Sequence, residues 1–158
     1  MSIHVDVQRA LPQAEPTDQQ LEAWVVAALQ GRRDAAELTV RIVDRDESAA
    51  LNQTYRHKAG PTNVLSFPFE LPPGLDQDTV ADLLGDLVIC APVVAAQAGE
   101  QHKSPEAHWA HMVVHGTLHL LGYDHLEPQQ AEAMEGLEIS ILNQLGFANP
   151  YAEERQEQ

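Results

Sequence analysis

The chain has 158 residues, of which 44% are hydrophobic and 21% charged, and its formal net charge is −15 at pH 7. This length suits one domain with one buried core, and the single cysteine, Cys90, excludes an internal disulfide framework. The acidic excess argues against a general nucleic-acid binder, because nonspecific affinity for phosphate groups comes from lysine and arginine.

Apolar periodicity predicts four strands and five helices in the order βαβαββααα. We expect strands at residues 3–7, 38–42, 63–69 and 86–90, and helices at 18–31, 47–55, from Pro92, at 105–122 and at 128–145. Asp18 is expected to cap the first helix. Pro68 indicates that the third strand lies at a sheet edge, because proline cannot donate a ladder hydrogen bond. Residues 70–80 predict a loop.

Because the helices gather after the strands, this order predicts an α+β fold with a small mixed sheet of about four strands packed with about five helices. The domain is expected to span residues 1–150, followed by a polar tail at 151–158. The N-terminus lacks a basic region followed by an apolar run, so no signal peptide is predicted. The longest apolar stretch, at 87–99, is shorter than the roughly 20 residues of a membrane helix. We therefore expect a cytoplasmic protein without a membrane span.

The run HGTLHLLGYDH, residues 115–125, places three histidines where one metal ion can bind all of them. His115 and His119 are four residues apart, which puts both rings on one face of a helix. Gly122 is expected to end that helix, because glycine tolerates a left-handed cap, and the chain then turns back to bring His125 to the same point. Three histidines leave tetrahedral zinc one position short, which in catalytic sites is open to water or substrate. We therefore predict one zinc ion per chain.

Other histidines and the cysteine leave alternatives open. His108 and His111 lie on the same helical stripe as His115 and are predicted to be ordinary core or surface histidines. His111 is also a candidate for a hydrogen bond beside the metal ligands or for assisting proton transfer, and the general base is otherwise unassigned. A structural zinc site, with Cys90 as its fourth ligand, is the main alternative to a catalytic one.

The spacing of the histidines equals that of the metzincin proteases, H-E-x-x-H-x-x-G-x-x-H, except that Gly116 stands where they have glutamate. In those enzymes the glutamate is the general base, so this chain lacks a group that metal-dependent peptide hydrolysis needs. A metallopeptidase is therefore the least favoured function.

Four segments accompany the histidines in a fixed order along the chain. They are LNQTYR at 51–56, TNVLSFP at 62–68, LGDLVI at 84–89 and HMVVHG at 111–116. Together with the histidine run they resemble the signature of the YbeY-type bacterial endoribonucleases of ribosomal RNA maturation. The resemblance implies that the three histidines bind zinc and that Arg56 is needed for activity. It also implies that the substrate is single-stranded RNA at or near the 3′ end of the small-subunit rRNA.

Several polar residues are candidates for the rest of the site. Arg56 can make forked hydrogen bonds to phosphate oxygens, although a surface salt bridge is its alternative role, and Lys58 can extend the same anion-binding rim. The other candidates are Asn63 and Ser66 in the substrate cleft, and Asp124 and Asp86 as acceptors for the second ring nitrogen of a ligand. Each of these four has an equally ordinary role in local backbone hydrogen bonding.

The residues and the resemblance together favour a zinc-dependent endoribonuclease specific for single-stranded RNA, acting in maturation of the 16S rRNA 3′ end and in ribosome quality control. Its expected partners are pre-16S rRNA and the small ribosomal subunit or its proteins. Six of the nine basic residues lie between positions 32 and 58, so RNA is expected to bind there. The alternative is a non-catalytic, zinc-stabilised ribosome-assembly factor whose acidic surface docks on basic ribosomal proteins.

Overall fold

A mixed four-stranded sheet forms the centre of the computed structural model, which describes residues 2–151. The strands are β1 (Ser2–Arg9), β2 (Ala35–Val43), β3 (Val64–Pro68) and β4 (Leu83–Cys90). Their order across the sheet is β1-β2-β4-β3, with β1, β2 and β4 parallel and β3 antiparallel to β4. The predicted mixed sheet is confirmed, and β3 forms an edge whose last residue is Pro68.

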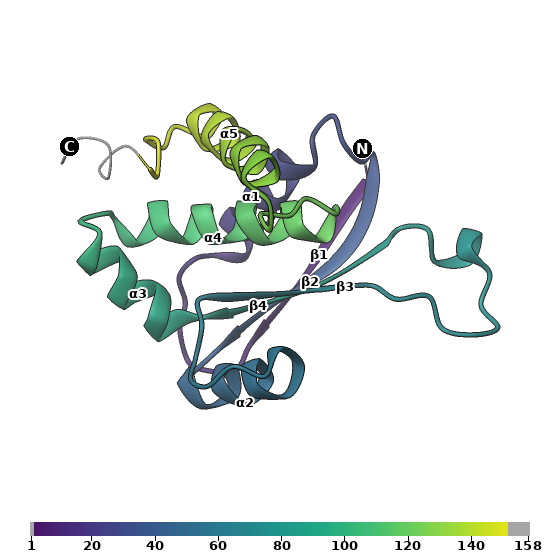
Figure 1. The fold of residues 1–158 in the computed structure, drawn as a ribbon, viewed down its shortest axis with the longest axis horizontal. Coiled ribbons are helices and arrows are strands. Elements are labelled where there is room, and N and C mark those ends of the chain that lie inside the picture. Colours follow the sequence, from purple (N-terminus) through teal and green to yellow (C-terminus); the bar gives the residue numbers. More distant parts are fainter. Residues whose placement is uncertain (1, 152–158) are drawn as a thin grey trace.

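Helices cover the two faces of this sheet unequally (Figure 1). They are α1 (Asp18–Leu29), α2 (Arg45–Arg56), α3 (Ala91–Glu100), α4 (Pro105–Leu120) and α5 (Pro128–Gln144), with a 3₁₀ turn, η1 (Gln77–Val80), between β3 and β4. Helix α4 packs on β3 and β4 and contacts α1, α3 and α5, whereas α2 lies on the other face of the sheet. The predicted α+β fold and element order are therefore confirmed. Across residues 2–151, no helix is long and apolar enough to cross a membrane.

The first helix begins differently from the prediction. Thr17, not Asp18, is the cap: its hydroxyl accepts a hydrogen bond from the backbone N–H of Gln20 at 3.1 Å. The Gln20 side chain in turn accepts one from the Thr17 N–H at 2.9 Å. Asp18 instead pairs with Arg9 at 2.7 Å. Threonine and aspartate are both suitable caps, and the reciprocal bond from Gln20, three residues after Thr17, decides between them.

Strand β4 begins at Leu83 rather than at Asp86 as predicted. Gly85, with φ +144°, interrupts the apolar alternation, and the pairing with β2 is irregular at this level. A Cβ at this position would overlap the carbonyl oxygen of Phe67 and would lie 2.9 Å from Leu120 Cδ2. Glycine is therefore required where β3, β4 and the end of α4 meet.

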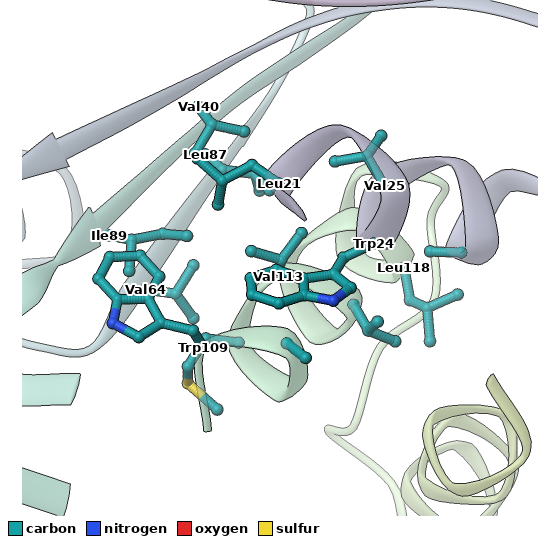
Figure 2. Close-up of a cluster of buried hydrophobic side chains, with 14 of the residues drawn as sticks. Leu21, Trp24, Val25, Val40, Val64, Leu87, Ile89, Trp109, Val113 and Leu118 are labelled. Atoms are coloured by element: carbon teal, nitrogen blue, oxygen red, sulfur yellow. The ribbon is translucent and has the colours of Figure 1, made fainter. Parts of the chain in front are cut away.

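The main core lies between the sheet and helices α1, α4 and α5 (Figure 2). Its buried side chains include Leu21, Trp24, Val40, Leu87, Ile89, Trp109, Val113 and Leu118. From His108 to Leu120, helix α4 buries every residue except His115 and His119, which are partly exposed. The core thus fixes the backbone of this helix and leaves two of its side chains accessible.

A smaller core on the other face of the sheet contains the cysteine. Buried Cys90 packs there with Leu51 of α2 among its neighbours. The sheet separates this cluster from helix α4, because neighbouring residues of a strand point to opposite faces. Cys90 is therefore not a fourth ligand for the histidines, and a structural zinc site completed by this cysteine is excluded.

Candidate metal centre

Three histidines meet where helix α4 ends. His115 and His119 come from the last two turns of α4, and His125 comes from the loop that follows. Gly122, with φ +104°, donates its N–H to the carbonyl oxygen of His119 at 3.0 Å and turns the chain back. One ring nitrogen from each histidine lies within 4.8 Å of the other two. The structure thus brings together the three histidines that the sequence analysis predicts as metal ligands.

The donor set fits a single transition-metal ion. Imidazole nitrogens suit zinc, copper, iron and nickel. Burial lowers the pKa of His119, with a further contribution from His115 and His125, and the neutral ring is the form that binds a metal. Within the described range 2–151, no other group of three histidine, cysteine or acidic side chains is arranged in this way. The centre can therefore hold a metal ion. Its three imidazoles are compatible with zinc but do not distinguish zinc from copper, iron or nickel.

The histidines line a hollow of about 530 Å³. Its other walls come from the end of α2, the edge strand β3 and the loop after α4. The predicted residues found in these walls are Arg56, Asn63, Ser66 and Asp124. Ser66 and Asn63 also bind neighbouring groups, since Ser66 donates to the carbonyl oxygen of Gly116 at 3.3 Å and Asn63 to the Gln97 side chain at 3.1 Å.

Arg56 is the exposed last residue of α2. The helix ends there because His57 has a left-handed backbone, with φ 58°, and donates its N–H to the carbonyl oxygen of Gln53. No acidic side chain in the described part of the chain forms an ion pair with Arg56. Its guanidinium is therefore available to an anion that enters the hollow.

Three predicted residues lie outside this hollow, and two of them, Lys58 and Asp86, also lie away from the histidines. Lys58 is exposed and is not part of its walls. Asp86 is exposed on β4 and lines a different hollow, of about 660 Å³, together with Arg41 and Glu47. Its neighbour Leu87 packs in the main core, so the alternation of the strand turns Asp86 to the other face of the sheet. The structure thus brings neither residue to the histidines.

A buried carboxylate that the sequence analysis missed contacts the cluster. Glu138 of α5 is 1% exposed. Its Oε2 accepts a hydrogen bond from His115 Nδ1 at 3.2 Å, and its Oε1 accepts one from His111 Nε2 at 2.5 Å and one from the Tyr151 hydroxyl at 2.9 Å. His111 is therefore joined to a candidate metal ligand, His115, through Glu138. Tyr151 belongs to the predicted polar tail, whose other residues, 152–158, lie outside the described residues.

Hydrogen bonding keeps Glu138 ionised despite its burial. Burial raises the pKa of its carboxyl group, but hydrogen bonds from His111 and His115 outweigh this and lower the pKa to about 2. The sequence held one signal of this role. Glu138 lies on the buried stripe of α5 with Met134 and Ile141, where an acidic residue is rare unless it is paired.

Fold and site together define a single-domain α+β protein with a three-histidine metal centre and an arginine in the same hollow. Residues 7–146 match the family model described as Endoribonuclease YbeY. The chain therefore belongs to the YbeY family, which confirms the resemblance noted from its motifs.

Two known proteins illustrate this relationship. A protein of Methylococcus capsulatus named Endoribonuclease YbeY is 59% identical over 155 residues, which cover 98% of this chain and 99% of that protein. The solution structure of TM1509 from Thermotoga maritima is similar with a TM-score of 0.62 and 23% identity, over 98% of this chain and 93% of that chain. The second comparison supports the fold alone.

Proposed function

We propose that this chain is a zinc-dependent endoribonuclease that cuts single-stranded RNA in the cytoplasm, in maturation of the 16S rRNA 3′ end and in ribosome quality control. The observation that carries the proposal is that three potential metal ligands and Arg56 line one hollow. Membership of the family and the name of the Methylococcus capsulatus relative support RNA cleavage. The proposed partners are pre-16S rRNA and the small ribosomal subunit or its proteins.

The histidines and the arginine have separate tasks in this proposal. His115, His119 and His125 would hold one zinc ion, which supplies a Lewis acid that polarises a phosphate oxygen and acidifies water. The Arg56 guanidinium would bind two oxygens of the scissile phosphate and stabilise the negative charge that develops there. Because Arg56 has no ion pair among residues 2–151, binding the phosphate breaks no existing one.

Aromatic side chains next to Arg56 favour a single-stranded substrate. Tyr55 is 62% exposed, and its ring meets that of Phe67 edge-on with the centroids 5.2 Å apart. Both side chains line the hollow that holds the histidines. Unpaired bases stack on exposed aromatic rings, whereas the bases of a duplex are already stacked on one another. Asn63 and Ser66, which line the same hollow, are proposed to contact the same strand of RNA.

The packing of Gly116 argues against a peptidase. A Cβ at this position would lie 2.7 Å from Leu87 Cδ2, 3.2 Å from Val64 Cγ2 and 3.3 Å from Ser66 Oγ. The position of the protease glutamate therefore faces the packed sheet, and a side chain there would have to displace the buried Leu87. Peptide hydrolysis would therefore lack its general base, because the packing of α4 on the sheet favours glycine at the position of that base.

Mapping the cut site tests the proposal. The purified, zinc-loaded protein should cleave labelled single-stranded RNA and pre-16S rRNA, and His119→Ala and Arg56→Ala should abolish or strongly reduce that cleavage at the same position. Intact RNA with the parent protein, or equal cleavage by both variants, would contradict it.

A non-catalytic assembly factor remains the second candidate, because one surface suits a basic protein partner. The connection between β3 and β4 extends away from the sheet (Figure 1). It carries exposed Phe69, Leu71 and Leu75, and the chain as a whole has a net charge of −15. Apolar side chains in an acidic surface match basic, partly apolar proteins. Restoration of ribosome maturation in cells by a His115→Ala, His119→Ala double variant would favour this candidate over the nuclease.

A further inference from the structure

The carboxylate of Glu138 joins three elements that are distant in the sequence. Its Oε2 faces His115 of α4 at 3.2 Å, and its Oε1 faces the Tyr151 hydroxyl at 2.9 Å and His111 Nε2 at 2.5 Å. The side chain is 1% exposed, so these groups replace water as its hydrogen-bond donors. Both oxygens are thus occupied, one toward the metal centre and the other toward the C-terminal segment.

The contact with Oε2 fixes which nitrogen of His115 carries hydrogen. An ionised carboxylate only accepts hydrogen bonds, so the Nδ1 atom that meets it must be the protonated nitrogen of the ring. The other nitrogen, Nε2, then keeps its lone pair. A neutral imidazole free of such a partner divides between two tautomers, of which only one offers Nε2 to a metal.

The same logic applies to His111. Its Nε2 donates to Oε1, and its Nδ1 has no hydrogen-bond partner in the described structure. The same Nε2 also lies 3.3 Å from the Tyr151 hydroxyl, so among the described residues the polar atoms of the His111 ring contact only Glu138 and the tyrosine that Glu138 binds. The ring of Tyr151 packs edge-on against that of His111, with centroids 5.4 Å apart and an interplanar angle of 86°. Tyr151 therefore contacts both members of the His111–Glu138 pair.

We propose that Glu138 is a positioning residue for the metal centre, and that Tyr151 and His111 hold Glu138 in place. Glu138 sets the tautomer and the orientation of the His115 ring before any metal binds. The C-terminal segment is therefore part of the metal centre through Tyr151, although it supplies no ligand. This proposal rests on the assignment of His115 as a metal ligand, and it does not depend on the substrate.

Zinc binding and ring tautomers test the proposal without an activity assay. Glu138→Gln removes the charge at constant size, and Glu132→Gln makes the same change at an exposed position of the same helix. We expect Glu138→Gln to weaken zinc binding by about 10- to 100-fold in competition with a chelator, which is the usual effect of losing such a partner. Glu132→Gln should leave the zinc affinity within twofold of the parent, on the order of experimental error.

Nitrogen-15 NMR of the histidine rings supplies the second readout. In the metal-free parent, His115 should be the Nδ1–H tautomer, and in Glu138→Gln it should become a mixture of tautomers. A merely structural Glu138 would leave the tautomer unchanged. Unchanged zinc affinity together with an unchanged tautomer in Glu138→Gln would overturn the proposal.

Tyr151→Phe keeps the test valid if Glu138→Gln does not fold. It removes one hydroxyl and keeps the ring against His111, and it should weaken zinc binding by about 2- to 10-fold, the usual effect of one hydrogen bond. Parent-like zinc affinity in Tyr151→Phe would contradict the role of the C-terminal segment. A parent protein that binds zinc but leaves RNA intact would refute the nuclease alone, and one that binds no metal would refute both proposals.

Discussion

The Ser66 hydroxyl on the edge strand β3 donates a hydrogen bond to the carbonyl oxygen of Gly116 on helix α4, at 3.3 Å. Gly116 directly follows His115, a proposed metal ligand, and Ser66 lies in the wall of the hollow that the histidines share with Arg56. This hydrogen bond therefore joins the helix of the candidate metal centre to β3, whose Ser66 is proposed to contact RNA. A Cβ at residue 116 would lie 3.3 Å from the Ser66 hydroxyl oxygen, so glycine favours this close approach.

Gly116→Ala should destabilise the protein by about 1–3 kcal/mol, the usual cost of overpacking a core. The new Cβ would meet Leu87, which is fully buried and has no solvent to move into. Urea unfolding of the metal-free protein measures the effect. Gly136→Ala is the matched control, because a Cβ there meets nothing within 4 Å and alanine favours a helix by about 0.5–1 kcal/mol. Equal changes of stability in both variants would show that the close approach of α4 to β3 is unimportant.

Arg56→Lys should lower kcat on a single-stranded RNA by about 10- to 100-fold, and Arg56→Ala by about 100- to 1000-fold. Lysine keeps the charge but loses the forked geometry that matches phosphate. Because Arg56 forms no ion pair within residues 2–151, the melting temperature should stay the same. Arg45→Ala, at the exposed start of the same helix, is the control and should retain parent activity. A comparable loss of activity in Arg45→Ala would point to a general effect of charge.

Acid should destabilise the protein through His108. Burial, together with smaller contributions from the nearby His111 and Lys103, lowers the pKa of this histidine to about 4. The unfolded chain therefore binds a proton near pH 6.5 that the folded protein binds only near pH 4, so stability falls as the pH falls through this range. The loss reaches about 3 kcal/mol by pH 4.

Urea unfolding at pH 7 and at pH 5 measures this effect of His108. His108→Gln removes the titrating ring while keeping a group that donates to Gln97, as His108 Nε2 does at 2.9 Å. The variant should lose less stability than the parent between the two pH values. Parallel losses would show that His108 does not control the acid sensitivity.

Removal of the metal should stop RNA cleavage and leave the protein folded. The core around α4 consists mainly of apolar side chains, and none of the three histidines is buried. Added zinc should then raise the stability by about 2.7 kcal/mol at 100 times its dissociation constant. Circular dichroism with and without a chelator, followed by thermal melts, measures both effects. Unfolding on chelation would instead identify a structural zinc site.

Local relationships made much of the site predictable from the sequence. The four-residue step from His115 to His119 and the turn at Gly122 involve only neighbours along the chain, so the spacing of one short run was enough to predict their convergence with His125. The cap of α1 was missed for an equally local reason, because Gln20 favours Thr17 over Asp18.

Contacts between distant segments could not be predicted in the same way. Glu138 is 23 residues from His115, and whether it faces α4 depends on how α5 packs. Asp86 was predicted near the metal centre, but its position on the other face of the sheet depends on which side of β4 receives helix α4. A strand pattern shows that alternate residues share a face and leaves open which face that is.

Along the C-terminal three-quarters of α4, only His115 and His119 are partly exposed. One side of the binding site is therefore a helix held in the core, and the opposite side is the exposed end of α2 with Arg56. Because the other residues of this stretch are buried, the backbone amides of this helix should exchange with deuterium among the slowest in the protein. A metal ion held by His115 and His119 would thereby be attached to this buried helix. The part of the hollow that adapts to the shape of a bound RNA strand is therefore the end of α2, which carries Arg56.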